Sequence, residues 1–451
     1  MVKFWRENGV RIVLYLDDGW SVNRDYHSSL LDSGFVFDTL KRAGFVVNFE
    51  KSVVKPVNNL SWLGLIWNSE EHSICIPETR IVDLFQSIDH VLSSLRNVSA
   101  RLLAQVTGRI ISMSPVIGNI ARIKSRHLYR CIESRFTWDQ SFRLIDQAVI
   151  EELLFWKFHI RSLNLRKLSE YKIPSIVFYS DASNHACGVV TVQGKFDLFH
   201  KMWTKEEADS SSTWRELKSI ELFLRTFQDS LSGKVVKGFT DSKNCESIVM
   251  SGSTKSDLHK IAISIFSLCS ECSISLEVKW LPRDQNTVAD AASKIFDYDD
   301  WGVTLEFFDF VNSIYGPHTV DRFADHNNAR LPYFNSRYAT YGSSGVDAFS
   351  FDWHGHNNWL VPPISLVCKA IHHCLASKAV GTLVVPKWPS SPFWPLIFRN
   401  AYLTHAYVSD VLEFEHSDRI FKQGSYKDSV FGSCDFRSSV LVIRIDGESM
   451  K

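Results

Sequence analysis

The spacing of apolar residues changes along the chain and divides it into parts. Residues 1–80 contain short apolar runs between turn residues, which predicts strands and turns. The runs are RIVLYL, FVVNFEKSVV, LSWLGLIW and SICIP. In residues 81–168 the apolar side chains recur every three or four residues, which predicts helices. This spacing is clearest at Leu102, Leu103, Val106, Ile110 and Met113.

The second half of the chain alternates predicted strands and helices. Strands and helices alternate over residues 173–295 and again over residues 304–412. An acidic aromatic stretch, residues 296–302, lies between these two parts. Residues 413–451 are rich in serine and end in one more predicted strand, SSVLVIRID, to which we assign no role. The fold class predicted for the whole chain is multidomain, with α/β and α+β parts.

Length and charge narrow the possible functions. A chain of 451 residues is long enough for two to four domains, and its 45% apolar residues can form sizeable cores. Fifty basic residues balance fifty acidic ones, which excludes a histone-like polycation. The balance is compatible with a nucleic-acid enzyme in which acidic sites offset basic grooves.

The location expected for the protein is intracellular, in the cytoplasm or the nucleus. No run of 18 apolar residues is free of charge, and the first residues do not have the layout of a signal peptide. Nine scattered cysteines, an odd number, indicate a reducing compartment.

Two adjacent acids, Asp17 and Asp18, follow the apolar run RIVLYL and precede Gly19. Two carboxylates in a turn after a strand can bind Mg²⁺, which prefers hard oxygen ligands. The alternative is a polar hairpin turn, because Asp-Gly is a strong turn dipeptide.

The stretch from 101 to 130 carries six cations and no acid. The cations are Arg101, Arg109, Arg122, Lys124, Arg126 and Arg130. Such a stretch predicts a surface that binds nucleic-acid phosphates without sequence preference. The alternative is an ordinary solvated helix face.

Four carboxylates stand where strands end or helices begin. Asp181 follows SIVFYS, Glu216 lies early in SSTWRELKSIELFLRTF, Asp241 follows KVVKGFT, and Asp290 opens a short helix after SLEVKWLP. Such positions can converge at one edge of a mixed sheet. Clustered carboxylates need cations to neutralise them, and two divalent ions can activate water to attack a phosphodiester. The alternative is four unrelated surface acids.

Residues 173–295 resemble the ribonuclease H fold. The matching stretches are YSDAS, CGVV, TWRELKSIEL, FTDSKNCESIV and WLPRDQNTVADAASK. The resemblance implies that Asp181, Glu216, Asp241 and Asp290 are catalytic ligands of Mg²⁺ or Mn²⁺, and that Asn286 contacts the hybrid or positions other groups. Glu221 is the second acid of the helix and should point elsewhere. Many members have a histidine before the last aspartate; here that loop has none, and Arg283 stands nearby as a nucleic-acid contact.

The first 165 residues resemble the reverse transcriptases of DIRS-like retrotransposons. The matching stretches are YLDD (15–18), AGFVVN followed by Lys51-Ser52, WLGL (62–65), and TGRIISMSPVIGNIARIKSRHLY. The resemblance implies a partial palm over 1–80, with Asp17 and Asp18 as metal ligands, and a helical thumb and connection over 81–168. The fingers and the first palm aspartate are not found, so we expect no DNA synthesis by this chain alone.

The third part of the chain carries, in this order, Asp321, Asn327, Asp347, Trp353, two prolines, the predicted strand TLVVP and Trp394. With this order residues 304–412 resemble the phage-type adenine methyltransferase domain of the same elements, which implies a Rossmann-like fold. The family has Asp or Asn, two prolines and an aromatic residue at its catalytic motif, where an acid or amide binds the target amino group and a ring stacks on the base. This chain has Val361, Pro362, Pro363 and Ile364 there. We therefore expect a degenerate domain that does not use S-adenosylmethionine.

Together these resemblances predict a DIRS-like retroelement protein with metal-dependent ribonuclease H activity. The expected partners are RNA–DNA hybrids, DNA and RNA, with no membrane. Two alternatives remain open. One is a non-enzymatic nucleic-acid-binding remnant, and the other is a polymerase half that is active only with a separate upstream fragment.

Overall fold

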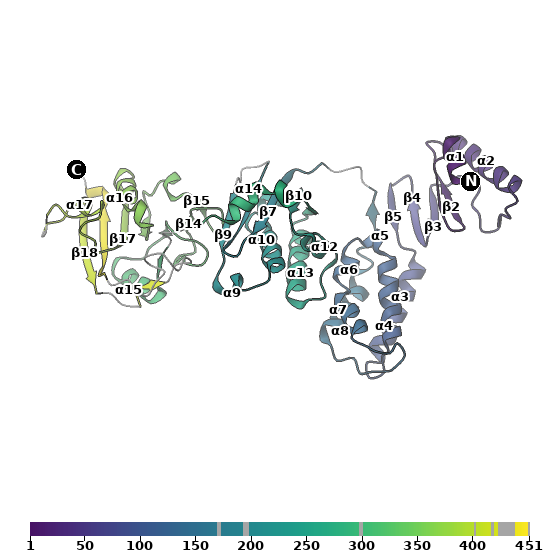
Figure 1. The fold of residues 1–451 in the computed structure, drawn as a ribbon, viewed down its shortest axis with the longest axis horizontal. Helices are drawn as coiled ribbons and strands as arrows, with labels where there is room; N and C mark the ends of the chain where they lie inside the picture. Colours follow the sequence, from purple (N-terminus) through teal and green to yellow (C-terminus); the bar gives the residue numbers. More distant parts are fainter. Residues whose placement is uncertain are drawn as a thin grey trace. The chain divides into compact units, whose positions relative to one another are not determined.

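The computed structural model describes residues 1–168, 173–192, 198–296, 301–400, 403–415, 419–422 and 438–449. The chain forms two compact units, residues 1–172 and 173–451, which we call the N-terminal and C-terminal units (Figure 1). Residues 297–300 of the predicted acidic stretch, and much of the predicted tail, lie outside the described residues.

The N-terminal unit begins with a two-stranded hairpin and two helices. They are α1 (Val2–Glu7), β1 (Ile12–Tyr15), β2 (Asp18–Ser21) and α2 (Tyr26–Arg42). The prediction of strands and turns for residues 1–80 missed both α1 and α2. The first turn of α2 is capped by Asp25, which accepts from the Ser28 amide at 2.8 Å. The strand predicted for FVVNFEKSVV, residues 45–54, is wrong, because no strand forms there.

An antiparallel sheet of four strands follows the hairpin. Its strands are β3 (Asn59–Trp62), β4 (Leu65–Asn68), β5 (Ser73–Cys75) and β6 (Arg166–Lys167). The stretch LSWLGLIW is therefore a hairpin, with Leu63 and Gly64 at φ values of 50° and 71° in a tight two-residue turn. Trp20 of β2 packs against Trp67, with ring centroids 4.9 Å apart.

The helices predicted for residues 81–168 are confirmed. They are α3 (Glu78–Ser93), α4 (Ala100–Ser112), α5 (Ser114–Ile117), α6 (Ile120–Ile123), α7 (Arg126–Glu133) and α8 (Gln147–His159). Their cores form because apolar residues three or four apart share one helix face, as Leu103, Val106 and Ile110 do on α4.

The C-terminal unit begins with a mixed five-stranded sheet in the order β11-β10-β7-β8-β9. Its strands are β7 (Ile176–Ala182), β8 (Ala186–Thr191), β9 (Leu198–Met202), β10 (Val235–Thr240) and β11 (Ser275–Trp280). β7, β10 and β11 run parallel, whereas β8 is antiparallel to β7 and to β9. The strands predicted at SIVFYS, ACGVVTV, KVVKGFT and SLEVKWLP are confirmed.

Helices cover both faces of this sheet. The helices are α9 (Lys205–Ala208), α10 (Ser212–Thr226), α11 (Gln228–Leu231), α12 (Lys243–Ser251), α13 (Ser256–Glu271) and α14 (Thr287–Ser293). Cys187 and Val189 of β8 belong to the core shared with α10 and α13, whereas Gly188 between them faces Ala292 of α14. Because successive residues of a strand point to opposite faces, α14 lies on the face opposite α10.

A second five-stranded sheet follows, in the order β13-β16-β17-β20-β18. Its strands are β13 (Val320–Asp321), β16 (Asn357–Leu360), β17 (Val380–Pro386), β18 (Val408–Phe414) and β20 (Val440–Asp446). The strand predicted in the tail is thus β20, which pairs antiparallel with both β17 and β18. Of the predicted tail, the described strand β20 is therefore part of this sheet.

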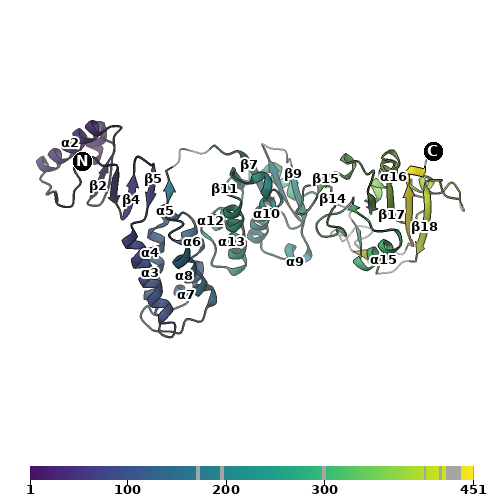
Figure 2. The same ribbon diagram turned by 180° about the vertical axis from the view of Figure 1, so that it is seen from behind.

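The second sheet also has a helix on each face (Figure 2). Leu383 of β17 shares a core with α16 (Val367–Ala376), and its neighbour Val384 shares another with α15 (Leu305–Tyr315). Among the described residues, no helix combines the length and the apolar character needed to cross a lipid bilayer.

Candidate metal centre

Three carboxylates converge at one end of the first sheet of the C-terminal unit. Asp181 lies near the end of β7, Asp241 directly follows the parallel neighbour β10, and Glu216 reaches the same place from α10. One ligand oxygen from each lies within 4.8 Å of the other two. Oxygen atoms at this spacing fit a divalent cation such as Mg²⁺.

Burial makes this cluster costly without a cation. Burial raises the pKa of Asp181, and the charges of Asp241 and Asp290 raise it further. The pKa of Glu216 is raised well above its ordinary value, first by burial and then by the charges of Asp181 and Asp241. These like charges favour a bound cation, which would let all three carboxylates ionise.

Neighbouring groups hold the carboxylates in place. Glu216 accepts hydrogen bonds from the Ala182 amide at 3.3 Å and the Thr240 hydroxyl at 3.5 Å. The hydroxyl of Ser293, which is fully buried, donates to Asp181 Oδ2 at 2.5 Å. Sequence reasoning missed Ser293, although it lies one helical turn after Asp290 and so shares its helix face.

Trp280 was also missed, and it fixes the backbone beside Asp241. Its indole Nε1 donates to the Asp241 carbonyl at 3.0 Å, and Lys243 Nζ lies 4.4 Å from its ring centroid. The signal available in the sequence was an aromatic residue at the end of the strand that neighbours β10.

Asp290, the fourth predicted ligand, lies in an ion-pair network. Its carboxylate binds Lys294 at 2.5 Å and Arg283 at 3.3 Å, and the bond to Lys294 is the main cause of its lowered pKa. Arg283 Nε also lies 3.9 Å from Asp241. The structure thus groups Asp181, Glu216 and Asp241, whereas Asp290 is neutralised by two cations.

Asn286 is buried, with 1% of its surface exposed, and its Nδ2 donates to the Ser180 carbonyl at 2.9 Å. In this fold the Asn286 side chain is directed into the protein and toward β7, and its role as a nucleic-acid contact stays a prediction. The other reading of Asn286, as a positioning group, fits this bond, which ties the start of α14 to β7.

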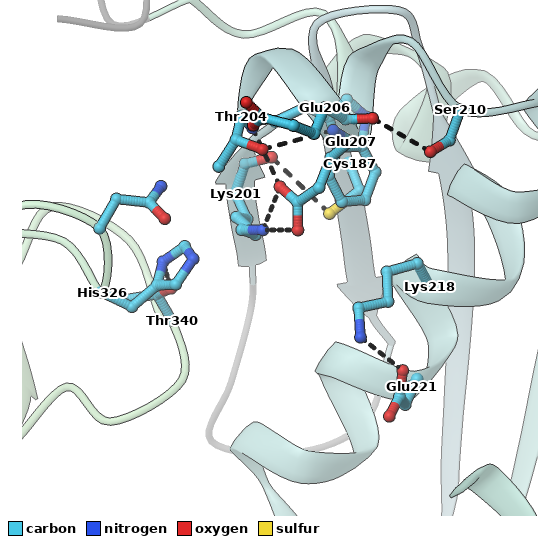
Figure 3. A network of polar contacts seen from close by, with 12 residues as sticks. Cys187, Lys201, Thr204, Glu206, Glu207, Ser210, Lys218, Glu221, His326 and Thr340 are labelled. Carbon is cyan, nitrogen blue, oxygen red and sulfur yellow. Dashed lines mark hydrogen bonds and ion pairs between the residues drawn. The ribbon is translucent and has the colours of Figure 1, made fainter. Parts of the chain in front are cut away.

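Glu221, the second acid of α10, faces away from the carboxylate cluster. It accepts from Lys218 at 2.8 Å (Figure 3) and from Arg225 at 2.9 Å. Ser264 of α13 donates to the same carboxylate at 2.5 Å. These contacts join α10 to α13 and leave Glu221 a structural role.

Gly188 sets the distance between α14 and the sheet. A Cβ atom at this position would lie 2.5 Å from Ala292 Cβ and 2.6 Å from the Ser293 amide nitrogen. We expect Gly188→Ala to displace α14, to lower the free energy of unfolding by about 1–3 kcal/mol, and to weaken any activity that needs Ser293. Thermal unfolding measures the effect. Gly108→Ala is the control, since nothing lies within 4 Å of its added Cβ, and an equal loss in both variants would contradict the prediction.

Asp17 and Asp18 lie on the exposed β1–β2 hairpin. The turn residues are Leu16 and Asp17, and Asp18 pairs with Tyr15, so the turn is not the Asp-Gly turn considered above. Among the described residues, no group of three possible metal ligands includes either acid.

The basic stretch is acid-free in sequence but not in space. Arg101 pairs with Asp139 at 2.5 Å, and Arg130 lies 3.8 Å from Asp146. Arg109 donates to the Asp83 carbonyl at 2.6 Å. The positive charge of the stretch is therefore reduced locally, because the carboxylates of Asp139 and Asp146 lie against Arg101 and Arg130.

The other three cations of the stretch differ in exposure. Arg122 is exposed, and Lys124 lies 5.2 Å from the ring centroid of Phe155. Arg126 is half-buried, and burial lowers its pKa. Arg122 is thus the cation of these three that is best placed to meet phosphates, and the half-buried Lys124 follows it two residues later.

The stretch Val361, Pro362, Pro363 and Ile364 directly follows β16. Val361 and Pro362 are buried, and the Pro362 carbonyl accepts from Trp301 Nε1 at 2.9 Å. Pro363 lines a cavity described below. Neither apolar side chain that flanks the prolines can bind an amino group by hydrogen bonds.

No protein-family model matches the chain, and no curated protein matches it. Among solved structures it is similar to a foamy viral protease–reverse transcriptase in complex with double-stranded DNA. The sequence identity is 14% and the TM-score is 0.32. The match covers 62% of this chain and 47% of the viral protein, so this chain spans about half the length of the viral protein.

It is also similar to ribonucleases H1. For the enzyme of Halobacterium salinarum NRC-1 the identity is 20% and the TM-score 0.22, over 26% of this chain and 92% of that one. For LC11-RNase H1 from compost the identity is 19% and the TM-score is 0.23, over 27% of this chain and 93% of that enzyme. These scores are too low to assign the chain to either class of protein.

Proposed function

We propose that the chain is a metal-dependent nuclease that cleaves the RNA strand of RNA–DNA hybrids, as part of a retroelement-derived protein. The observation that carries this proposal is the group of Asp181, Glu216 and Asp241, with ligand oxygens within 4.8 Å of one another at a sheet edge. Their order along the chain and the mixed sheet that presents them both fit the resemblance to ribonuclease H.

Asp181, Glu216 and Asp241 would hold Mg²⁺ or Mn²⁺. The bound metal would activate water and stabilise the leaving oxygen in phosphodiester hydrolysis. Ser293 fixes the rotamer of Asp181, and the Ala182 amide and the Thr240 hydroxyl fix Glu216. The ligand oxygens are thus positioned before a metal arrives.

Asp290 and Arg283 act at the border of this site. Arg283 and Lys294 form ion pairs with Asp290, and at least one of these pairs must break before Asp290 can serve as a metal ligand. Arg283 is 73% exposed on its side chain, so it can swing toward a phosphate of the hybrid when a metal takes over the charge of Asp241 and Asp290.

Cleavage specificity tests the proposal. The full chain is incubated with Mg²⁺ or Mn²⁺ and with matched RNA–DNA hybrid, double-stranded RNA and double-stranded DNA. We expect cleavage of the RNA strand of the hybrid only, and none in EDTA. Hybrid binding without cleavage would favour the non-enzymatic remnant, and cleavage of all three duplexes would exclude a hybrid-specific nuclease.

The basic stretch should add non-specific affinity for the hybrid. Replacing Arg122 and Lys124 together by Gln removes two cations, so the slope of log K against log salt concentration should become shallower by up to about 1.8. Fluorescence anisotropy of a labelled hybrid at several salt concentrations measures the slope. A Lys205→Gln, Lys260→Gln double variant is the control for net charge, and identical slopes in both double variants would contradict the prediction.

A further inference from the structure

A cavity of about 350 Å³ lies in the C-terminal unit, where the edge strand β9 meets the residues around β14 (Asn335–Ser336). The Ala339 carbonyl accepts from the His200 amide of β9 at 3.4 Å, and the ring of Tyr338 packs on that of His200 with centroids 5.1 Å apart. The cavity lies apart from the carboxylate cluster, none of whose residues lines it, and its volume suits one small ligand.

Arg322 supplies a buried positive charge to the wall of this cavity. It is 2% exposed, and burial lowers its pKa to about 10, which leaves it charged at neutral pH. Its guanidinium donates to Asn358 Oδ1 at 2.8 Å, to Asn335 Oδ1 at 2.9 Å and to the Asp352 carbonyl at 3.4 Å. These bonds use three of its five N–H groups.

In the part of the chain that the structure describes, no carboxylate lies within ion-pair distance of Arg322. A buried charge without a counter-ion is costly, and an anionic ligand would remove this cost. An arginine fork also matches the oxygens of a phosphate or a carboxylate.

Asn335 is a second buried group with unmet bonding capacity. It is fully buried and lines the cavity, and its Oδ1 faces Arg322. Its Nδ2 has no hydrogen-bond partner among the described residues. Buried amide donors in native proteins are nearly always satisfied, so this donor points to a ligand with an acceptor atom.

Several other charged groups of the cavity wall already have partners, and Arg337 lies with its Cζ 5.4 Å from the ring centroid of Tyr338. Lys201 pairs with Glu207 at 2.5 Å, and His326 lies opposite this pair (Figure 3). Asp325 accepts from the Asn327 amide at 2.7 Å, and Asp347 from the Phe349 amide at 3.1 Å. Each acid caps its own local turn, and neither forms an ion pair with Arg322 among the described residues.

The cavity is also lined by aromatic rings, those of Phe323, Tyr338 and Phe349. The exposed Lys369 holds its Nζ 3.9 Å from the ring centroid of Phe349. A cation beside flat apolar rings suits a ligand that joins an anionic group to a planar ring.

We propose that this cavity binds a nucleoside phosphate, with its phosphate at Arg322 and Lys369 and its base against the aromatic lining. The site is independent of the proposed nuclease, because it uses other residues and requires no metal.

Calorimetric titration of the full chain tests this proposal. AMP, GMP, CMP and UMP are titrated separately in EDTA, so that no metal can tether phosphate to the carboxylate cluster. Adenosine, inorganic phosphate and S-adenosylmethionine are the comparison ligands. We expect at least one nucleotide to bind roughly tenfold or more tightly than the nucleoside or the phosphate alone.

Lys369→Ala should weaken nucleotide binding by roughly tenfold, because it removes one charged contact at an exposed position that the fold does not need. Lys260→Ala, an exposed lysine of α13 outside the cavity, should leave binding unchanged. The proposal is overturned if no nucleotide binds, if adenosine binds as tightly as AMP, or if S-adenosylmethionine binds more tightly than every nucleotide.

Discussion

Asp241→Asn is expected to abolish cleavage of RNA–DNA hybrids while leaving the fold intact. The substitution keeps the shape of the side chain and removes one negative charge from the group that would hold the metal. Loss of a metal ligand removes several kcal/mol of transition-state stabilisation, so we expect the rate to fall by about 10²–10³-fold or more.

Asp241 is the best of the three positions for this test. Its side chain is 18% exposed, whereas Asp181 and Glu216 are buried among backbone and side-chain partners. Its replacement should therefore cost little stability. Single-turnover cleavage of a labelled hybrid in Mg²⁺ measures the effect, and circular dichroism and hybrid affinity show whether the variant is folded.

Asp284→Asn is the matched control. Asp284 is exposed in the loop between β11 and α14, and its carboxylate has no hydrogen bond or ion pair among the described residues. The Asp284→Asn variant should cleave the hybrid at the rate of the unchanged chain. Cleavage by Asp241→Asn at a similar rate would show that the carboxylate cluster is not the active site.

Much of this candidate site could be predicted because its signals are local. A strand that ends in an acid, and a helix with an acid in its early turns, are visible in the sequence around Asp181, Asp241 and Glu216. The parallel pairing of β7 with β10 then brings the first two together.

The parts that could not be predicted depend on contacts between distant residues. Asn286 is buried because Ser180, 106 residues earlier, offers it a carbonyl. The pairing of Asp290 with Arg283 depends on how the loop before α14 folds. In the same way β20 enters the second sheet between two strands that precede it, and sequence periodicity carries no information about strand order.

Glu216→Gln is expected to make the metal-free protein more stable and inactive. The unchanged glutamate is buried beside two other carboxylates, so ionisation of Glu216 costs free energy in the folded state. Glutamine keeps an oxygen for the Ala182 amide and gains an NH₂ group that can donate to the neighbouring carboxylates. We therefore expect a higher free energy of unfolding and a higher Tm for Glu216→Gln than for the unchanged chain at pH 8 in EDTA.

The dependence on pH gives this prediction a definite sign. The pKa of Glu216 is higher in the folded than in the unfolded chain, so the folded state binds the proton more tightly. The unchanged protein without metal therefore loses stability as the pH rises from the ordinary pKa of a glutamate to the raised one. Below that interval Glu216 is protonated in both states, and the advantage of Glu216→Gln should vanish.

Differential scanning calorimetry in EDTA at pH 4 and pH 8 measures both effects, and Glu277→Gln is the control. Glu277 lies exposed on β11, 3.5 Å from Lys279, and exposed ion pairs contribute little stability. Adding Mg²⁺ at pH 8 should raise the Tm of the unchanged protein more than that of Glu216→Gln, since the bound ion relieves the same repulsion. Two results would contradict the prediction. Glu216→Gln could be less stable than the unchanged chain, or it could be stabilised by the same amount at pH 4 and at pH 8. Either result would show that the charge of Glu216 does not destabilise the metal-free fold.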